Sequence, residues 1–167
     1  ELNNPAAPLD PGVATLDSQY ECEGFMVFRL ERVACWKTKD GGHGVQTLSE
    51  ALGNSCNLAM AQMALDTGIN KFYDYIYAFG FNKETDVGIP SEDTGEVVHR
   101  KYIRESDLSR IAFGENITTT AIQMANAFCA IINGGTLMQP YVVDNITSTD
   151  GTVIVKSEPT LLRRVIS

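Results

Sequence analysis

Hydrophobic positions recur with a helical period along the middle of the chain. Residues 58–65 are apolar except for Gln62, so they leave almost no polar face and predict a helix buried on nearly every side, with Gly68 placed to end it. Just upstream, Thr47 and Glu50 have the spacing of a capping box, in which both side chains accept hydrogen bonds from first-turn amides. We therefore expect a short helix that ends near Leu52, followed by the buried helix.

Two more helices follow from the same kind of pattern. Residues 70–79 place aromatic and aliphatic side chains at i, i+3, i+4 and i+7, and this spacing is typical of core packing. Thr120 and Gln123 form a second capping box, and the helix they begin should end at residues 133–135. The inward side chains expected of these two helices are Phe72, Tyr75, Ile76 and Phe79 in the first, and Ala121, Ala125, Phe128, Cys129 and Ile132 in the second.

Strand-like patterns are short and lie outside the helical region. Residues 25–28 and 32–36 predict two strands around a turn, and residues 141–147 and 152–156 predict a hairpin. The turn-rich, acidic residues 80–106 indicate a surface excursion. The sequence thus predicts an α+β fold that is mostly helical, with short strands at its edges.

Composition narrows the classes of protein that are possible. The chain of 167 residues is 44% hydrophobic and 20% charged, which suits a single globular domain. Residues 1–19 contain three prolines and suggest an extended lead-in or a designed junction, which leaves residues 20–167 as the folded part. The net charge of -8 without a basic cluster argues against nucleic acid and anionic membrane as partners. No apolar run is long enough for a membrane span or a signal peptide.

The sequence allows two alternatives for the four cysteines and gives no sign of a metal site. Cys22, Cys35, Cys56 and Cys129 lack the paired C-x-x-C spacing of a zinc ribbon, and histidines are scarce, so we expect no metal site. Two alternatives remain for the thiols. One is a single disulfide from Cys35 to Cys22 or to Cys56, and the other is four buried free thiols.

His43 and His99 are interpreted without catalytic roles. His43 lies beside glycines, and no serine or cysteine partner is marked for it in the sequence, so we expect it to anchor a loop by hydrogen bonding. His99 follows two valines and precedes Arg100 and Lys101, which indicates an exposed side chain.

Ser55-Cys56-Asn57 is the tripeptide with the clearest chemical potential. It lies between two predicted helices, where a sharp reversal would direct a hydroxyl and a carboxamide into one cleft. Such a pair can relay a proton and hold a peptide carbonyl. The alternative is a helix cap in which Asn54, Ser55 or Asn57 binds first-turn amides.

Several blocks around this tripeptide occur in an order that resembles the penicillin-binding transpeptidases, closest to the class B cell-division and sporulation enzymes. In that family a C-[HW] and an H-G element precede a helix that ends at an S-x-N motif. The corresponding blocks here are Cys35-Trp36, His43-Gly44, Ser55-Cys56-Asn57, Phe79-Gly80-Phe81, Thr85, Gly88-Ile89-Pro90, Glu92, Ala112-Phe113-Gly114, Thr118-Thr119-Thr120, Gln123, Ala127, Asn133-Gly134-Gly135 and Pro140. One departure is Glu115-Asn116, where the family usually has Gln-Gly.

The resemblance implies a fold and a site. The fold would be the helical subdomain of the serine transpeptidase and β-lactamase-like fold. Ser55 would belong to a hydroxyl relay between the nucleophilic serine and the leaving amine, and Asn57 would bind the amide of the donor peptide. Cys56 would point inward and fix the turn with its backbone. The whole protein would crosslink peptidoglycan stem peptides by serine acyl transfer at the extracytoplasmic face of the membrane, without a metal or organic cofactor, and β-lactams would acylate it.

The other two elements of the family's signature are not in the sequence. No serine has a lysine three residues on, and Lys37-Thr38-Lys39 and Lys156-Ser157-Glu158 lack the glycine of a K-[ST]-G strand. We therefore expect a central, inactive piece of a membrane-anchored transpeptidase that needs the rest of its domain as a partner. The alternative is a natural, catalytically dead module that binds cell-wall peptide or a division partner.

Overall fold

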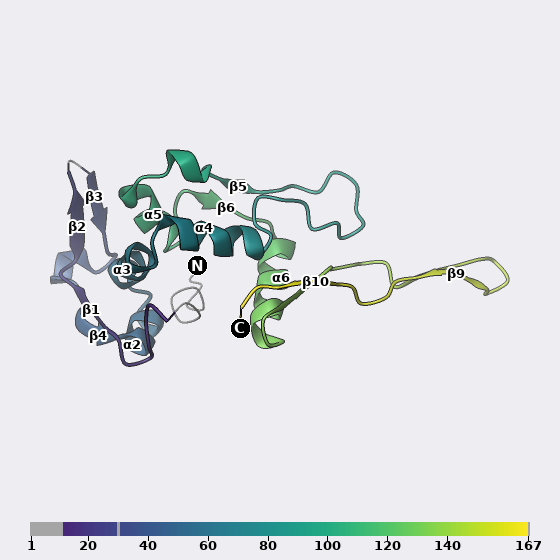
Figure 1. The fold of residues 1–167 in the computed structure, drawn as a ribbon, viewed down its shortest axis with the longest axis horizontal. Coiled ribbons are helices and arrows are strands. Elements are labelled where there is room, and N and C mark those ends of the chain that lie inside the picture. Colours follow the sequence, from purple (N-terminus) through teal and green to yellow (C-terminus); the bar gives the residue numbers. More distant parts are fainter. Residues whose placement is uncertain (1–11, 30, 167) are drawn as a thin grey trace. The chain divides into compact units, whose positions relative to one another are not determined.

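The computed structural model describes residues 12–29 and 31–166, which form two compact units (Figure 1). Unit 1 contains the described residues up to 74 together with residues 98–117, and unit 2 contains residues 75–97 and 118–166. Helix α4 (Ile69–Ala78) and the short strands β5 (Glu96–Val97) and β6 (Ile117–Thr118) lie in the sequence where the chain passes from one unit to the other.

Unit 1 contains two antiparallel strand pairs, of which the sequence predicted one. Strands β2 and β3 form the expected hairpin, with Phe25 opposite Ala34. The pair β1–β4 was not predicted, because the two strands are far apart in the sequence and β4 runs directly into the cap of α2. In β1 the side chains alternate, so that Tyr20 and Cys22 are buried. The strands are β1 (Gln19–Cys22), β2 (Phe25–Phe28), β3 (Glu31–Ala34) and β4 (Gly44–Thr47).

Helix α2 of unit 1 begins where its capping residues predicted. The Thr47 hydroxyl accepts from the Glu50 amide at 3.3 Å, and the Thr47 amide donates to the Glu50 carboxylate at 2.8 Å, so the predicted capping box is confirmed. Helix α5 was missed: it begins at Glu105, at the end of the predicted surface excursion, and the Arg104 amide donates to the Asp107 carboxylate at its start. The helical segments are η1 (Thr38–Asp40), α2 (Leu48–Gly53), α3 (Asn57–Thr67), η2 (Arg100–Tyr102) and α5 (Glu105–Ile111).

Helix α3 is the centre of the unit 1 core. Seven of its eleven residues are buried, as the uniformly apolar sequence predicted. It contacts α5, β1 and β3, and Leu58 and Met63 are among its most buried side chains. Each such side chain contributes about 1.5–3 kcal/mol of burial free energy. The S-x-N tripeptide is therefore attached to the most firmly packed helix of this unit.

The aromatic stripe of α4 is only partly as predicted. Ile76 and Phe79 are buried, but the other two members of the stripe are half-buried. Tyr73, which the periodicity left outside the stripe, is fully buried and donates its hydroxyl hydrogen to the Val98 carbonyl at 2.7 Å. This hydrogen bond satisfies the polar end of the ring and explains why a tyrosine can lie in the core.

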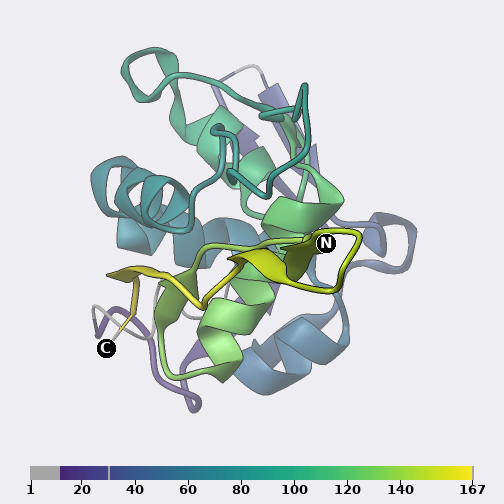
Figure 2. The ribbon, with the colours of Figure 1, turned by 90° about the vertical axis from the view of Figure 1, so that its right-hand side faces the viewer.

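Unit 2 is built around helix α6, with two antiparallel strand pairs. Figure 1 shows β10 running beside α6, and Figure 2 shows the same yellow segment against the green helix. The β8–β9 hairpin was predicted, whereas the β7–β10 pair joins segments too far apart for a local pattern. The elements are α6 (Ala121–Ile132), β7 (Thr136–Met138), β8 (Asn145–Thr147), β9 (Val153–Lys156) and β10 (Leu161–Arg164).

The predicted inward face of α6 is wrong. Gln123, Ala127 and Ala130 are buried, whereas every residue of the predicted face is exposed, including Phe128 and Ile132. Hydrogen bonding explains the orientation of the helix. The Gln123 side-chain amide donates to two backbone carbonyls within unit 2, at 2.8 and 2.9 Å, and these bonds fix which side of the helix faces inward. Burying these carbonyls without a donor would be costly.

The N-terminal expectation can be followed only in part. Residues 1–11 of the predicted lead-in lie outside the described residues. In the described remainder Ala14 is buried and β1 already begins at Gln19, so the ordered core starts before residue 20. Within the part of the chain that the structure describes, no helix combines the length and the apolar character required to cross a bilayer.

Candidate functional site

The tripeptide Ser55-Cys56-Asn57 forms a strained reversal between α2 and α3. Ser55 has a φ of 48°, a left-handed conformation that is unusual for a residue other than glycine. The Ser55 amide donates to the Leu52 carbonyl at 3.1 Å, and the Cys56 amide donates to the Ala51 carbonyl at 2.9 Å. These bonds close the end of α2 and turn the chain into α3, as the sequence predicted.

Two neighbouring side chains and one backbone carbonyl hold this reversal. The Trp36 indole donates to the Asn54 and Ser55 carbonyls, at 3.2 and 3.1 Å. The Asn54 carboxamide donates to the Gln46 side chain at 3.0 Å, and the Asn57 carboxamide donates to the carbonyl of residue 34 at 3.2 Å. The turn is thus tied to β3 and β4 as well as to the two helices.

The helix-cap alternative does not describe the two asparagines. Helix α3 has Cys56 as its N-cap residue, and this side chain makes no capping hydrogen bond. The carboxamides of Asn54 and Asn57 donate to groups of other segments. Ser55 and Asn57 are both half-buried.

Directly behind the turn, the structure brings together four side chains that the sequence did not connect. The ligand atoms of Cys22, Cys35, His43 and Cys56 all lie within 4.8 Å of one another. The three cysteines are at most 1% exposed. Local spacing therefore gave no ground for excluding a metal site, because the four residues come from β1, the end of β3, the loop before β4 and the start of α3.

The four thiols are free, so the expected disulfide is wrong, and the alternative of four buried thiols is correct for every cysteine except Cys129. The structure contains no disulfide among the four cysteines, and Cys129 is exposed, so the four are neither paired nor all buried. Burial raises the pKa of the Cys56 thiol to about 12. Burial, with a smaller effect of Lys37, lowers the pKa of His43 and favours its neutral form.

Backbone geometry explains how His43 reaches the cysteines. Strand pairing sets Cys22 opposite Gly44, and the Cys35 amide donates to the Gly24 carbonyl at 2.8 Å. The loop passes so close to Cys22 that a Cβ at Gly42 would collide with the Cys22 carbonyl oxygen. Gly42, with a φ of 90°, therefore allows the loop to approach Cys22 and places His43 beside the cysteines.

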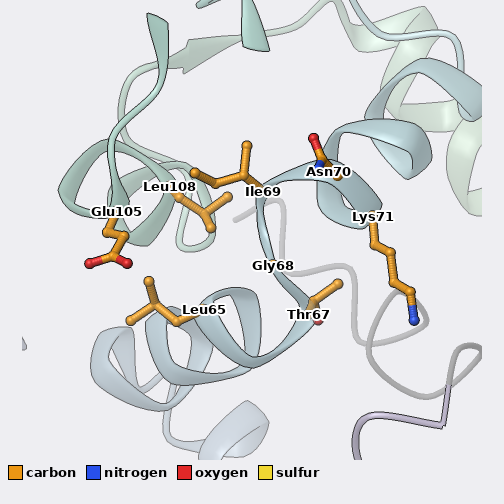
Figure 3. Close-up of a pocket in the computed structure, with 8 residues that line it drawn as sticks. All are labelled: Leu65, Thr67, Gly68, Ile69, Asn70, Lys71, Glu105 and Leu108. Atoms are coloured by element: carbon orange, nitrogen blue, oxygen red, sulfur yellow. The ribbon is translucent and has the colours of Figure 1, made fainter. Parts of the chain in front are cut away.

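A surface cavity lies elsewhere in unit 1, at the corner between α3 and α4 (Figure 3). Its volume is about 490 Å³, and neither Ser55 nor Asn57 lines it. Figure 3 shows Glu105 and Leu108 on one side of the cavity and Leu65 facing them from α3. His99 is exposed, as predicted.

Comparison with known proteins decides the family. The model of the penicillin binding protein transpeptidase domain matches residues 4–167. The chain belongs to this family. Stage V sporulation protein D of Bacillus subtilis is 34% identical over 140 residues, which are 81% of this chain and 21% of that protein. The chain thus spans about a fifth of the length of this relative.

Solved transpeptidase structures have the same fold. The D,D-transpeptidase domain of a peptidoglycan glycosyltransferase from Eggerthella lenta superposes with a TM-score of 0.87 at 26% identity, covering 97% of this chain and 42% of that chain. Penicillin binding protein 3 from Mycobacterium tuberculosis, complexed with aztreonam, superposes with a TM-score of 0.84 at 24% identity. The match covers 97% of this chain and 36% of that chain. The predicted α+β transpeptidase fold is confirmed.

The departure at Glu115-Asn116 from the family pattern has a simple structural explanation. Asn116 has a φ of 58°, a left-handed conformation that the glycine of the family pattern could adopt without steric strain. Asparagine is among the residues that tolerate this conformation best. The loop after α5 therefore retains a left-handed residue despite the substitution.

Proposed function

We propose that Ser55 and Asn57 are the S-x-N element of a peptidoglycan D,D-transpeptidase. The observation that carries this proposal is the left-handed Ser55 in a turn tied to two helices and two strands. Such a conformation costs on the order of 1–3 kcal/mol and persists where the surroundings impose it, commonly at functional sites. Packing of α3 stabilises the helix beyond the turn.

The chemistry assigned to the two side chains is proton transfer and substrate positioning. In the whole enzyme, a serine oxygen on polypeptide bearing S-x-x-K attacks the carbonyl of the stem peptide, and the terminal amine leaves with a proton. An acceptor amine then attacks the ester and releases the serine. The Ser55 hydroxyl relays the proton in both steps, while the Asn57 carboxamide holds the donor peptide.

The relatives support the same cellular context. They include a sporulation protein and a transpeptidase-family protein complexed with aztreonam, a β-lactam. The whole protein then acts on peptidoglycan at the extracytoplasmic face of the membrane and is acylated by β-lactams. This chain contributes the S-x-N element, and the remainder of the domain contributes the nucleophile and the K-[ST]-G strand.

The first test uses the chain of 167 residues by itself. Fluorescent penicillin should leave the chain unlabelled, because no serine in it has a lysine three residues on. Gel fluorescence and intact-mass spectrometry measure the adduct. A stable adduct on Ser55 would show that this serine is a nucleophile and not a relay.

The second test uses the full-length protein that contains this sequence. Ser55→Ala should slow acylation by penicillin about 10²- to 10⁴-fold, the usual size of a proton-transfer contribution. Ser91→Ala is the matched control, because Ser91 also has a left-handed φ, 59°, but lies in a loop of unit 2. Equal acylation rates for the two variants would leave Ser55 with a structural role only, and a full-length protein that penicillin never acylates would favour the binding-module alternative.

A further inference from the structure

The chain at the end of β3 hydrogen-bonds to the turn that carries the S-x-N tripeptide. The Asn57 carboxamide donates to the carbonyl of Ala34 at 3.2 Å. Two residues further on, the Trp36 indole Nε1–H donates to the carbonyls of Asn54 and Ser55, at 3.2 and 3.1 Å. A single N–H group that is shared between two carbonyls forms a bifurcated hydrogen bond. One short segment therefore binds both Ser55 and Asn57.

The placement of Trp36 is not explained by burial of its ring. The side chain is 63% exposed, so the hydrophobic effect contributes little to holding it where it is. Its polar edge is engaged instead, because Nε1–H is the only hydrogen-bond donor of an indole and it is directed at the turn. An edge-on contact with the ring of His43, at a centroid distance of 5.1 Å, orients the indole for this bond.

The two carbonyls that accept from the indole define the conformation of Ser55. They belong to the two peptide planes that meet at the Ser55 Cα, and the rotation of these planes is described by φ and ψ of that residue. The N–H groups of the same two planes donate to the carbonyls of Leu52 and Ala51, at 3.1 and 2.9 Å. Both planes are thus bonded at both edges, by α2 on one side and by Trp36 on the other. Relaxation of Ser55 from its φ of 48° to an ordinary value would rotate the planes and break at least one of these bonds.

We propose that Trp36 is a positioning residue that holds the hydroxyl of Ser55 in place for acyl transfer. It acts through the backbone of the turn and not by contact with substrate. This role rests on the relay function proposed for Ser55. A displacement of about 1 Å at a reacting group can slow a reaction about 10²-fold, so loss of the indole bond should have a measurable kinetic effect. Because the bonds to α2 remain, this loss should loosen the turn without unfolding the helix.

The first measurement tests the hydrogen bond in the chain of 167 residues. Trp36 is the single tryptophan of this sequence, so an isotopically labelled sample gives one indole N–H signal by nuclear magnetic resonance. This hydrogen should exchange with water at least about tenfold more slowly than that of N-acetyltryptophanamide, because it is bonded although the ring is exposed. Exchange at the rate of the model compound would overturn the proposal, and the measurement requires no variant.

The second experiment measures acylation of the full-length protein that contains this sequence. Trp36→Phe keeps an aromatic ring and removes the donor, and it should slow acylation at saturating penicillin about 10- to 100-fold. The penicillin concentration that gives half of the maximal rate should change little, because the indole acts on the turn and not on the ligand. Tyr102→Phe is the matched control, because Tyr102 is an aromatic residue of unit 1 with a similar exposure, 67%, and its substitution also removes one polar donor. This variant should be acylated at the wild-type rate.

A double-mutant cycle separates positioning from general support of the fold. In the Ser55→Ala background the relay hydroxyl is gone, so Trp36→Phe should slow acylation by no more than about twofold further. Equal slowing by Trp36→Phe in both backgrounds would give Trp36 an independent role and overturn the proposal, as would wild-type acylation of Trp36→Phe when Ser55→Ala is slow. If Ser55→Ala itself is acylated at the wild-type rate, the function proposed for Ser55 fails and the positioning role fails with it, whereas the hydrogen bond is judged by the exchange measurement.

Discussion

Gly41 and Gly42 are adjacent, and both have left-handed φ angles, of 82° and 90°, yet their surroundings differ. A Cβ at Gly41 would meet nothing within 4 Å, whereas a Cβ at Gly42 would collide with the backbone of Cys22. The first glycine is needed for its conformation alone. The second is needed for its conformation and for the close approach that brings His43 to the three cysteines.

This pair separates backbone strain from steric exclusion. Gly41→Ala should destabilise the chain by about 1 kcal/mol, the cost of a left-handed alanine. Gly42→Ala should cost at least about 3 kcal/mol, because a strand or loop must also move. Urea denaturation followed by circular dichroism measures both values. Similar values for the two variants would mean that the loop can shift away from Cys22 without loss.

The sequence singled out the residues of the S-x-N tripeptide but not the four side chains that cluster behind it. Ser55 and Asn57 were singled out because their tripeptide lies between two predicted helices and because the surrounding blocks resemble the family, and their catalytic roles stay a prediction. The four clustered side chains were missed because Cys22, Cys35, His43 and Cys56 are separated by 13, 8 and 13 positions. Contacts of that kind arise from strand pairing and from Gly42, and neither is visible in a C-x-x-C search.

Among the elements of unit 1, β3 and α5 are joined by an ion-pair network. The Glu31 carboxylate accepts from Arg104 at 2.7 Å and from Arg110 at 2.9 Å, and Arg104 also binds Asp107 at 2.9 Å. The hydrogen bond from Arg110 is the largest cause that lowers the pKa of Glu31 below its ordinary 4.5. Arg104 in the same way lowers the pKa of Asp107.

This network predicts a pH-dependent link between the two elements. A depressed carboxyl pKa contributes stability that is fully present above pH 4.5 and is lost as the pH falls through the lower folded-state value. Glu31→Gln should therefore lower the unfolding temperature at pH 7, and the difference from wild type should shrink below pH 4.5. Thermal scans from pH 3 to 8 measure it. A difference that does not change across this range would contradict an ionic origin.

The control for that experiment is an exposed ion pair of the same unit. Asp74 binds Arg100 at 2.8 Å, with side-chain exposures of 68% and 41%. Asp74→Asn should change the unfolding temperature less than Glu31→Gln, because solvent screens an isolated surface pair.

Element prediction succeeded where a local signal exists and failed where pairing is distant. The capping boxes at Thr47 and Thr120 were found because their partners lie three residues away. The β1–β4 and β7–β10 pairs were missed because each joins short strands that lie more than 20 positions apart in the sequence. The face of α6 was assigned wrongly because both sides of the helix are apolar, and Gln123 decides between them through carbonyls 29 and 40 positions away.

At the scale of the whole molecule, the described residues include a well-packed core in unit 1 and much apolar surface in unit 2. The core cluster gathers around α3 and includes Cys22, Cys35 and Cys56. In unit 2, α6 exposes one continuous apolar face, and Ile146 and Ile154 on the β8–β9 hairpin are 50% and 64% exposed. The Eggerthella domain is matched over only 42% of its chain, so more than half of that domain lies beyond the matched part.

The exposed face of α6 predicts that the chain of 167 residues self-associates. Phe128 and Ile132 lie one turn apart and are 56% and 82% exposed, and apolar patches of this kind favour association. Phe128→Ser with Ile132→Ser should raise the concentration at which oligomers form by about tenfold, which corresponds to about 1.4 kcal/mol. Sedimentation velocity over a concentration series measures this threshold.

Val45→Ser is the control for this pair of substitutions, because Val45 is 62% exposed on β4 of unit 1. Its threshold should match the wild type, since the substituted side chain lies outside the α6 face, and an equal rise in both variants would assign the association to general surface hydrophobicity.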